Sequence, residues 1–208
     1  MAKGGHMIIV LTGIDGSGKS TAAQALVSAV AAEGGRVLLL NNHAGRRSMS
    51  VLAAKLGIRP PSRVADAVET TFRVWNVLVN HLRASRFDGL VVMDRHLYCQ
   101  LALRETKGLG RGRLLPWLLD KLPAPEAVVH LEVDPLLAHH RIVSRGTDSE
   151  TLDDLVAFDR GYRQLPEFTG FLKVDASVPA PELAQRLAGV IRQLTPSTAA
   201  AQPALHGD

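Results

Sequence analysis

Length, composition and charge narrow the classes of protein to which this chain can belong. Its 208 residues, 46% of them hydrophobic and 21% charged, suit one compact domain with a full core and leave little room for a second. The formal net charge of +4 comes from scattered basic residues, which argues against a nucleic-acid partner. The single cysteine, Cys99, excludes an intramolecular disulfide and favours a reducing compartment, the cytoplasm. The apolar segment Met7–Leu11 is too short to span a bilayer, so we expect no membrane anchor.

Short apolar runs alternate with longer segments of helical periodicity along most of the chain. The runs rich in β-branched residues predict strands at Met7–Leu11, Arg36–Leu40, Leu90–Met93, Ala127–Val133 and Phe171–Val174. The periodic segments predict helices at Thr21–Glu33, Arg63–Ser85, Leu114–Leu122, Pro135–Ser144, Leu152–Gln164 and Pro181–Leu194. This alternation indicates an α/β fold, a doubly wound sheet of five parallel strands, in which ligands bind beyond the carboxyl ends of the strands.

We expect residues 7–195 to form a single domain. Residues 1–6 resemble the remnant of an expression tag, and residues 196–208 lack apolar periodicity and are expected to be disordered. The long helix Arg63–Ser85 carries one apolar stripe at three- and four-residue spacing, which predicts that this stripe packs into the core. The stripe consists of Val64, Val68, Phe72, Trp75, Val79 and Leu82.

A glycine-rich segment directly follows the first predicted strand. It runs from Gly13 to Ser20 and matches the pattern G-x-x-x-x-G-K-[ST], whose glycines let backbone N–H groups turn toward phosphate oxygens. In this pattern Lys19 reaches the β- and γ-phosphates and Ser20 offers a hydroxyl to Mg²⁺, so the sequence predicts a site for ATP and magnesium. An ordinary glycine-rich turn is the alternative. The residues expected to hold the nucleotide are Gly13, Gly16, Ser17, Gly18, Lys19, Ser20 and Thr21.

Asp94 and Arg95 stand at the expected carboxyl end of the third strand. An acidic residue there suits a magnesium ligand, and the neighbouring guanidinium suits an anionic acceptor. A capping aspartate beside a solvated arginine is the alternative.

Two arginines, Arg141 and Arg145, are spaced four apart on the helix that Gly146 is expected to end. This spacing predicts a short lid that carries both guanidinium groups over the transferring phosphate. The alternative is a surface network with nearby acidic residues, namely Asp148, Glu150, Asp153 and Asp154.

Taken in order, these segments resemble the thymidylate kinase branch of the nucleoside monophosphate kinases. The phosphate loop through Thr21, the triplet Asp94-Arg95-His96, the segment from Leu131 to Gly146 and the run Val174-Asp175-Ala176-Ser177 are each similar to a motif of that family. The resemblance implies a P-loop kinase that uses ATP with Mg²⁺, acts on a nucleotide acceptor and forms a possible homodimer.

The resemblance also implies roles for individual residues. Because a glycine stands at Gly16, the charge-stabilising role passes to the lid arginines. Arg95 is implied to contact the acceptor phosphate, Asp15 the acceptor sugar, and Asp175 the region of the adenine. The catalytic residues implied in this way are Lys19, Arg95, Arg141, Arg145 and Asp15, and Arg141 also counts among the residues that bind ATP.

The sequence departs from the family pattern at positions that recognise the acceptor. Asn41 to Arg47 replace the usual Arg-Glu-Pro-Gly-Gly-Thr, and Phe72 is followed four residues later by Asn76 where the family has arginine. The family's tyrosine, serine and lid arginine are replaced by His96, Cys99 and Ser149. These departures bear on recognition of thymine and leave phosphoryl transfer untouched.

Two classes of acceptor remain open. A phosphate acceptor needs cations to hold it against repulsion from ATP, whereas a hydroxyl acceptor needs a base, for which Asp15 or His43 is a candidate. The available cations are Arg46, Arg47, Arg73 and Arg95.

On the long helix, Phe72 could stack on a nucleobase while Asn76 offers its amide group to the edge of that base. A solvated helix face is the alternative. We therefore predict transfer of a phosphoryl group from ATP to a nucleoside monophosphate. A hydroxyl kinase, or a nucleotide-switch ATPase without an acceptor, remains the alternative.

Overall fold

Five parallel strands form the centre of the protein. The computed structural model describes residues 7–41, 62–146 and 150–194. The strands are β1 (Met7–Thr12), β2 (Val37–Asn41), β3 (Leu90–Asp94), β4 (Ala127–Glu132) and β5 (Leu172–Asp175), in the order β2-β3-β1-β4-β5. Every pair is parallel. The predicted fold class, an α/β sheet of five parallel strands, is confirmed.

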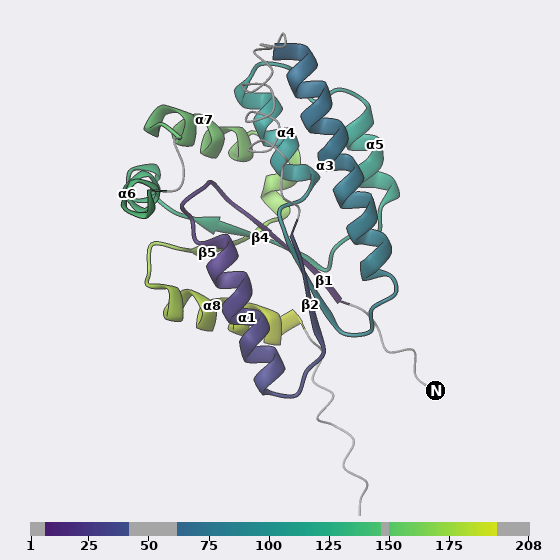
Figure 1. Cartoon of the computed structure of the whole chain (residues 1–208), viewed down its shortest axis with the longest axis vertical. Helices are drawn as coiled ribbons and strands as arrows, with labels where there is room; N and C mark the ends of the chain where they lie inside the picture. Colours follow the sequence, from purple (N-terminus) through teal and green to yellow (C-terminus); the bar gives the residue numbers. More distant parts are fainter. Residues whose placement is uncertain (1–6, 42–61, 147–149, 195–208) are drawn as a thin grey trace, which may run out of the picture.

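Helices cover both faces of this sheet (Figure 1). They are α1 (Lys19–Ala32), α3 (Ser62–Ala84), α4 (Leu97–Thr106), α5 (Leu114–Lys121), α6 (Pro135–Arg145), α7 (Leu152–Arg163) and α8 (Ala180–Leu194), with a 3₁₀ turn at Pro166–Gly170. Helices α1 and α8 pack together on one face, and α3, α4 and α5 lie on the other (Figure 1). Among the described residues, no helix is both long and apolar enough to cross a membrane.

Helix α4 is absent from the sequence-based prediction. It buries residues around most of its circumference, from Leu97 to Leu103. A helix that is covered on several sides lacks the one-sided apolar period that identifies an amphipathic helix. Sequence periodicity therefore cannot find it.

From Phe72 onward the apolar stripe of α3 faces outward, so the prediction that it packs into the core is wrong for this part of the helix. Phe72 is 52% exposed, Trp75 is 64% exposed, and Val79 and Leu82 are exposed as well. The buried face of α3 instead carries Val77 and Ala84 together with polar and charged side chains, namely Thr70, Arg73, Asn80 and His81. Helix α3 therefore turns a largely polar face toward α4 and the end of β2, and an apolar face is left at the surface.

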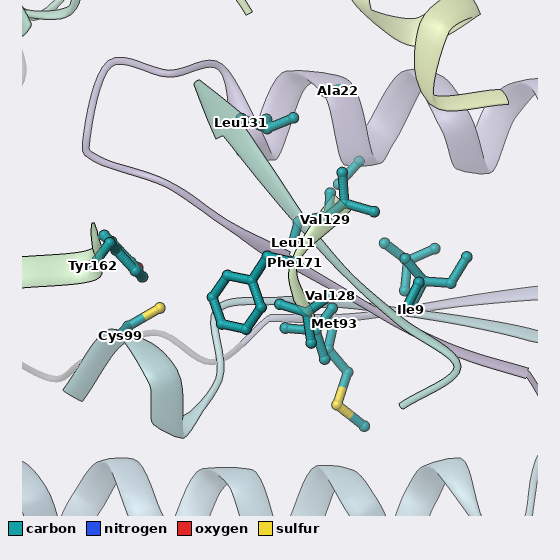
Figure 2. Packing of buried hydrophobic residues seen from close by; sticks show 14 of the residues in the cluster. Ile9, Leu11, Ala22, Met93, Cys99, Val128, Val129, Leu131, Tyr162 and Phe171 are labelled. Atoms are coloured by element: carbon teal, nitrogen blue, oxygen red, sulfur yellow. The ribbon is translucent and has the colours of Figure 1, made fainter. Parts of the chain in front are cut away.

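The hydrophobic core is centred on β1, which is hydrogen-bonded to β3 on one side and to β4 on the other. Figure 2 shows Ile9, Leu11 and Met93 among the packed side chains, with Cys99 and Tyr162 at the edge of the cluster. Because β1 is the middle strand, the loop that follows it lies at the centre of the carboxyl edge of the sheet, where doubly wound folds bind ligands.

Candidate active site

The phosphate loop folds tightly between β1 and α1. The backbone N–H of Ser17 donates to the carbonyl of Ile14 at 3.2 Å, and α1 begins at Lys19 with Gly18 as its cap. Gly16 has a φ of +82°, and a Cβ there would lie 2.4 Å from the backbone oxygen of Ala138 on α6. Only glycine fits a position that is both left-handed and in backbone contact with another helix. The loop and α6 are therefore packed against each other.

Lys19 lies inside the loop and is 5% exposed. Its ammonium donates to the carbonyl of Ile14 at 2.6 Å and to Ser17 Oγ at 3.3 Å, and it lies 3.6 Å from Asp15 Oδ1. Burial lowers the pKa of Lys19, and the negative charge of Asp15 opposes that shift. The cation is thus held at the position from which a phosphate loop lysine contacts nucleotide phosphates.

Arg95 joins the end of β3 to the phosphate loop. Its guanidinium donates to Asp15 Oδ1, and its backbone N–H donates to the carbonyl of Leu11 at 3.2 Å. Burial by itself raises the pKa of Asp15, but the positive charges of Lys19 and Arg95 outweigh burial and hold that pKa well below its usual range. A hydrogen bond with Glu150 adds to this effect. One carboxylate thus lies between the two cations that the sequence predicts to act on different phosphates.

Asp94, at the carboxyl end of β3, meets Ser20, in the first turn of α1. Ser20 Oγ donates to Asp94 Oδ2 at 2.7 Å. The other carboxylate oxygen, Asp94 Oδ1, is buried and has no hydrogen-bond partner within the described part of the chain. A hydroxyl beside a carboxylate with an unsatisfied buried oxygen is a donor set that fits Mg²⁺. These two residues therefore suit the predicted metal position.

We call the buried face of α3, together with the start of α4, the acceptor side. Arg73 is 1% exposed and lies three residues from Thr70, whose Oγ1 accepts a hydrogen bond from Gln100 Nε2 at 2.8 Å. Gln100 Oε1 is buried without a hydrogen-bond partner among the described residues. Sequence reasoning missed Gln100, because it lies on α4. Its only sequence signal is its position six residues after Asp94.

Phe72 and Asn76, the two helix residues expected to bind a base, are less buried than Arg73. Phe72 lies on the exposed apolar stripe, which counts against its stacking on a bound ring. Asn76 is half-buried, between the exposed and buried faces. Of the three residues predicted on this helix, the structure brings only Arg73 fully to the buried face.

We call the phosphate loop, α6 and the segment after β5 the donor side. Arg141 donates to the carbonyls of Ala176 at 2.9 Å and Ser177 at 3.1 Å, which fastens α6 to the end of β5. Arg145 Nε donates to the carbonyl of Arg141 at 3.2 Å, and Gly146 ends the helix with a φ of 63°. Both arginines therefore lie on one helix, as predicted.

Asp175 lies at the end of β5, where it accepts from the backbone N–H of Ser177 at 2.9 Å and from Arg186 at 3.0 Å. Thr21 is exposed in the first turn of α1. Several expected residues lie outside the described residues: Arg46, Arg47, His43 and Asp148.

Comparison with known proteins adds an independent finding. A sequence model of the thymidylate kinase family, described as "Thymidylate kinase", matches residues 11–187. The chain is 27% identical over 189 residues to a probable thymidylate kinase of Archaeoglobus fulgidus, covering 89% of this chain and 94% of that protein. It is 31% identical over 165 residues to a probable thymidylate kinase of Pyrococcus abyssi, covering 74% and 78%. A thymidylate kinase of Synechococcus is 27% identical over 202 residues, covering 89% and 95%.

Proposed function

The chain belongs to the thymidylate kinase family, and from that premise we propose that it transfers the γ-phosphoryl group of ATP to thymidylate with the help of Mg²⁺. Membership makes it an ATP-dependent nucleotide kinase. The finer proposal rests on the contacts of Asp15 with both Lys19 and Arg95. Through this carboxylate, the cation proposed to bind ATP and the cation proposed to bind the acceptor phosphate are held within one site.

On the donor side, Lys19 and the backbone N–H groups of the loop bind the β- and γ-phosphates. Arg141 and Arg145 stabilise the charge that develops during transfer, since Gly16 has no side chain that could do so. Asp175 and the carbonyls that Arg141 contacts lie where the adenine is expected. Phosphoryl transfer needs positioning and charge neutralisation more than covalent chemistry, and this side supplies both.

Ser20 and Asp94 are the residues that would hold Mg²⁺. The hydroxyl and the unsatisfied Asp94 Oδ1 supply oxygen donors of the type that magnesium prefers. When bound, the ion neutralises charge on the phosphate oxygens of ATP.

The lowered pKa of Asp15 favours a phosphate acceptor over a hydroxyl acceptor. A hydroxyl kinase needs a base near the acceptor oxygen. Because Lys19 and Arg95 hold the pKa of Asp15 well below its usual range, this carboxylate binds protons weakly near neutral pH. Arg95 can instead bind an acceptor phosphate with its planar fork, which needs no base. Asp15 then remains available to the acceptor sugar.

The polar groups of the acceptor side match a base with an imino N–H between two carbonyl oxygens. Gln100 Oε1 is a hydrogen-bond acceptor, and the Arg73 guanidinium is a donor. Thymine and uracil have that edge, whereas cytosine lacks the imino proton. We therefore assign base recognition to Arg73 and Gln100, with Asn76 at the margin of the same helix face.

A panel of acceptors at fixed ATP and Mg²⁺ tests the proposal by release of ADP. Thymidylate should give the highest kcat/KM, followed by deoxyuridylate, with cytidylate and unphosphorylated nucleosides much slower. Arg95→Ala should lower kcat/KM for thymidylate about 100-fold, because a charged hydrogen-bonded contact is lost. Arg86→Ala, at an exposed arginine, is the matched control. A response limited to unphosphorylated compounds would contradict a nucleotide acceptor.

We further propose that the outward stripe of α3 pairs with the same stripe of a second copy. Phe72, Trp75, Val79 and Leu82 form one exposed apolar row at helical spacing. Exposed rows of this kind mark interaction surfaces, and a twofold axis places identical rows against each other. Within residues 7–41, 62–146 and 150–194 this row stays exposed, and a second copy would supply the apolar partner.

Cytoplasmic placement is the remaining part of the proposal. Cys99, the single cysteine, is buried in the core beside Tyr162 (Figure 2). A free buried thiol is typical of proteins in a reducing compartment. ATP, the proposed phosphoryl donor, is also available there.

A further inference from the structure

Two buried histidines meet between α3 and the start of α4. His81 Nε2 and His96 Nε2 are 3.0 Å apart, and the two residues are 5% and 1% exposed. Their rings cross at 66° with centroids 5.3 Å apart. At this distance one imidazole donates an N–H to the bare nitrogen of the other. The pair is thus a direct hydrogen-bonded link between a helix and the turn that follows β3.

Each imidazole depends on the other for its side-chain hydrogen bond. Within the described part of the chain, Nδ1 of His81 and Nδ1 of His96 are both buried and have no hydrogen-bond partner. The His96 ring also packs against the ring of Tyr98, with centroids 5.1 Å apart. Removing the His81 imidazole would therefore leave the His96 side chain without a hydrogen bond to any other described residue.

The described residues offer this pair no further metal ligands. Among residues 7–41, 62–146 and 150–194, no group of three or more histidine, cysteine or acidic side chains is placed to hold an ion. Apolar packing does not explain the pair either, because leucine or phenylalanine would fill such a space without burying unpaired nitrogens. A role in placing a neighbouring residue accounts for the contact better.

That neighbouring residue is Arg95, which has a φ of 73°. This left-handed conformation is unfavourable for a residue with a side chain, and it persists where surrounding contacts hold it. The backbone N–H of Arg95 is held by Leu11, and the carbonyl of His96 accepts from the N–H of Cys99 at 3.1 Å as α4 begins. The contact between Arg95 and Asp15 holds the side chain at this turn, and the hydrogen bond between His96 and His81 holds the turn from the side of α3.

We propose that His81 is a positioning residue that acts through His96 to hold the Arg95 turn, so that the Arg95 guanidinium faces the phosphate loop. This inference rests on the proposed role of Arg95 in binding the acceptor phosphate. His81 belongs to the buried face of α3 that also carries Arg73, so one helix places both ends of the acceptor. The chemistry that His81 supports is recognition of a phosphomonoester.

The test compares three variants with the wild-type protein. His81→Phe keeps a ring and removes the hydrogen bond, and His81→Gln keeps a donor and an acceptor near the original Nε2. Val77→Ala weakens the same buried face of α3 one turn earlier without touching His96, and it controls for general loosening. Each variant is assayed for kcat, for the KM of thymidylate and ATP, for the Kd of thymidylate by calorimetry, and for Tm.

A positioning role predicts that His81→Phe raises the KM and Kd of thymidylate about tenfold while the KM of ATP changes less than twofold. His81→Gln should recover most of the loss, and Val77→Ala should lower Tm without changing either acceptor constant. An unchanged acceptor Kd in His81→Phe, or equal effects in Val77→Ala, overturns the inference. If His81→Phe does not fold, His81→Leu is measured in its place against the same expectation.

Arg95→Ala separates failure of this inference from failure of the proposed function. If Arg95→Ala raises the KM of thymidylate and His81→Phe does not, Arg95 binds the acceptor and the role of His81 is wrong. If Arg95→Ala leaves the KM of thymidylate unchanged, the proposed role of Arg95 is wrong, and the inference drawn from it is wrong as well.

Discussion

The donor side and the acceptor side of this site are built in different ways. The phosphate loop of the donor side is a local structure, in which eight consecutive residues from Gly13 to Ser20 are proposed to supply most of the contacts to phosphate. The acceptor side combines α3, the Arg95 turn and α4, which lie far apart in the sequence. The difference teaches that a phosphate site can be encoded in one loop, whereas recognition of a particular acceptor depends on how helices are docked.

The largest expected effect lies on the donor side. Lys19→Ala should lower kcat about 1,000-fold, because a preorganised cation at the transferring phosphate is lost. Tm should change little, since the loop is held by backbone hydrogen bonds. Kinetics by ADP release and thermal denaturation check both parts. Lys121→Ala, at an exposed lysine 3.3 Å from Asp120, is the control, and retained turnover in Lys19→Ala would refute the donor assignment.

The next effect concerns two adjacent residues of α3. Arg73→Met should raise the KM of thymidylate 10- to 100-fold, on the order expected for losing a hydrogen bond from a charged group. Phe72→Ala should leave that KM unchanged, because Phe72 is exposed. Steady-state kinetics of the two variants measures the contrast directly. The reverse result would restore the sequence-based interpretation of Phe72 as a base-stacking residue.

A smaller effect is expected at the outward stripe. Trp75→Glu places a charge on the apolar row and should weaken self-association at least tenfold, as measured by sedimentation equilibrium. Leu136→Glu introduces the same change at an exposed apolar position of α6 and should leave association unaltered. A wild-type protein that stays monomeric at every concentration would exclude the proposed pairing.

The smallest effect is the pH dependence of stability contributed by His130. Burial, together with the positive charges of Arg163, Lys19 and Lys173, lowers the pKa of His130 from 6.5 to about 3. The unfolded chain therefore takes up the proton first, so the stability associated with neutral His130 is complete above about pH 6.5 and is lost progressively as the pH falls toward 3.

At pH 5 this linkage amounts to about 2 kcal/mol of the free energy of unfolding. Urea denaturation between pH 7 and 5 should show a shallower pH slope in His130→Gln than in the wild-type protein. His140→Gln, at an exposed histidine, should keep the wild-type slope. Equal slopes in all three proteins would show that His130 takes up its proton over the same pH range in the folded and unfolded chain, so that folding does not lower its pKa.

Two regions show how far the sequence leads. All five strands were predicted to within one residue at each end, because each is a short β-branched run bounded by polar residues. Helix α3 was also predicted, yet its orientation was wrong, because an apolar stripe does not tell whether it faces the core or another molecule. Helix α4 was missed since burial on several sides removes its periodicity, and Gln100 was missed with it.

The sequence by itself determined the phosphate loop, the parallel sheet and the helix that carries Arg141 and Arg145. These depend on spacing within one segment, which local chemistry decides. The tertiary structure alone decided that Asp15 lies between Lys19 and Arg95, that Arg73 faces inward, and that His81 is hydrogen-bonded to His96. Such contacts join residues that are distant in the chain, and they arise from the docking of whole elements.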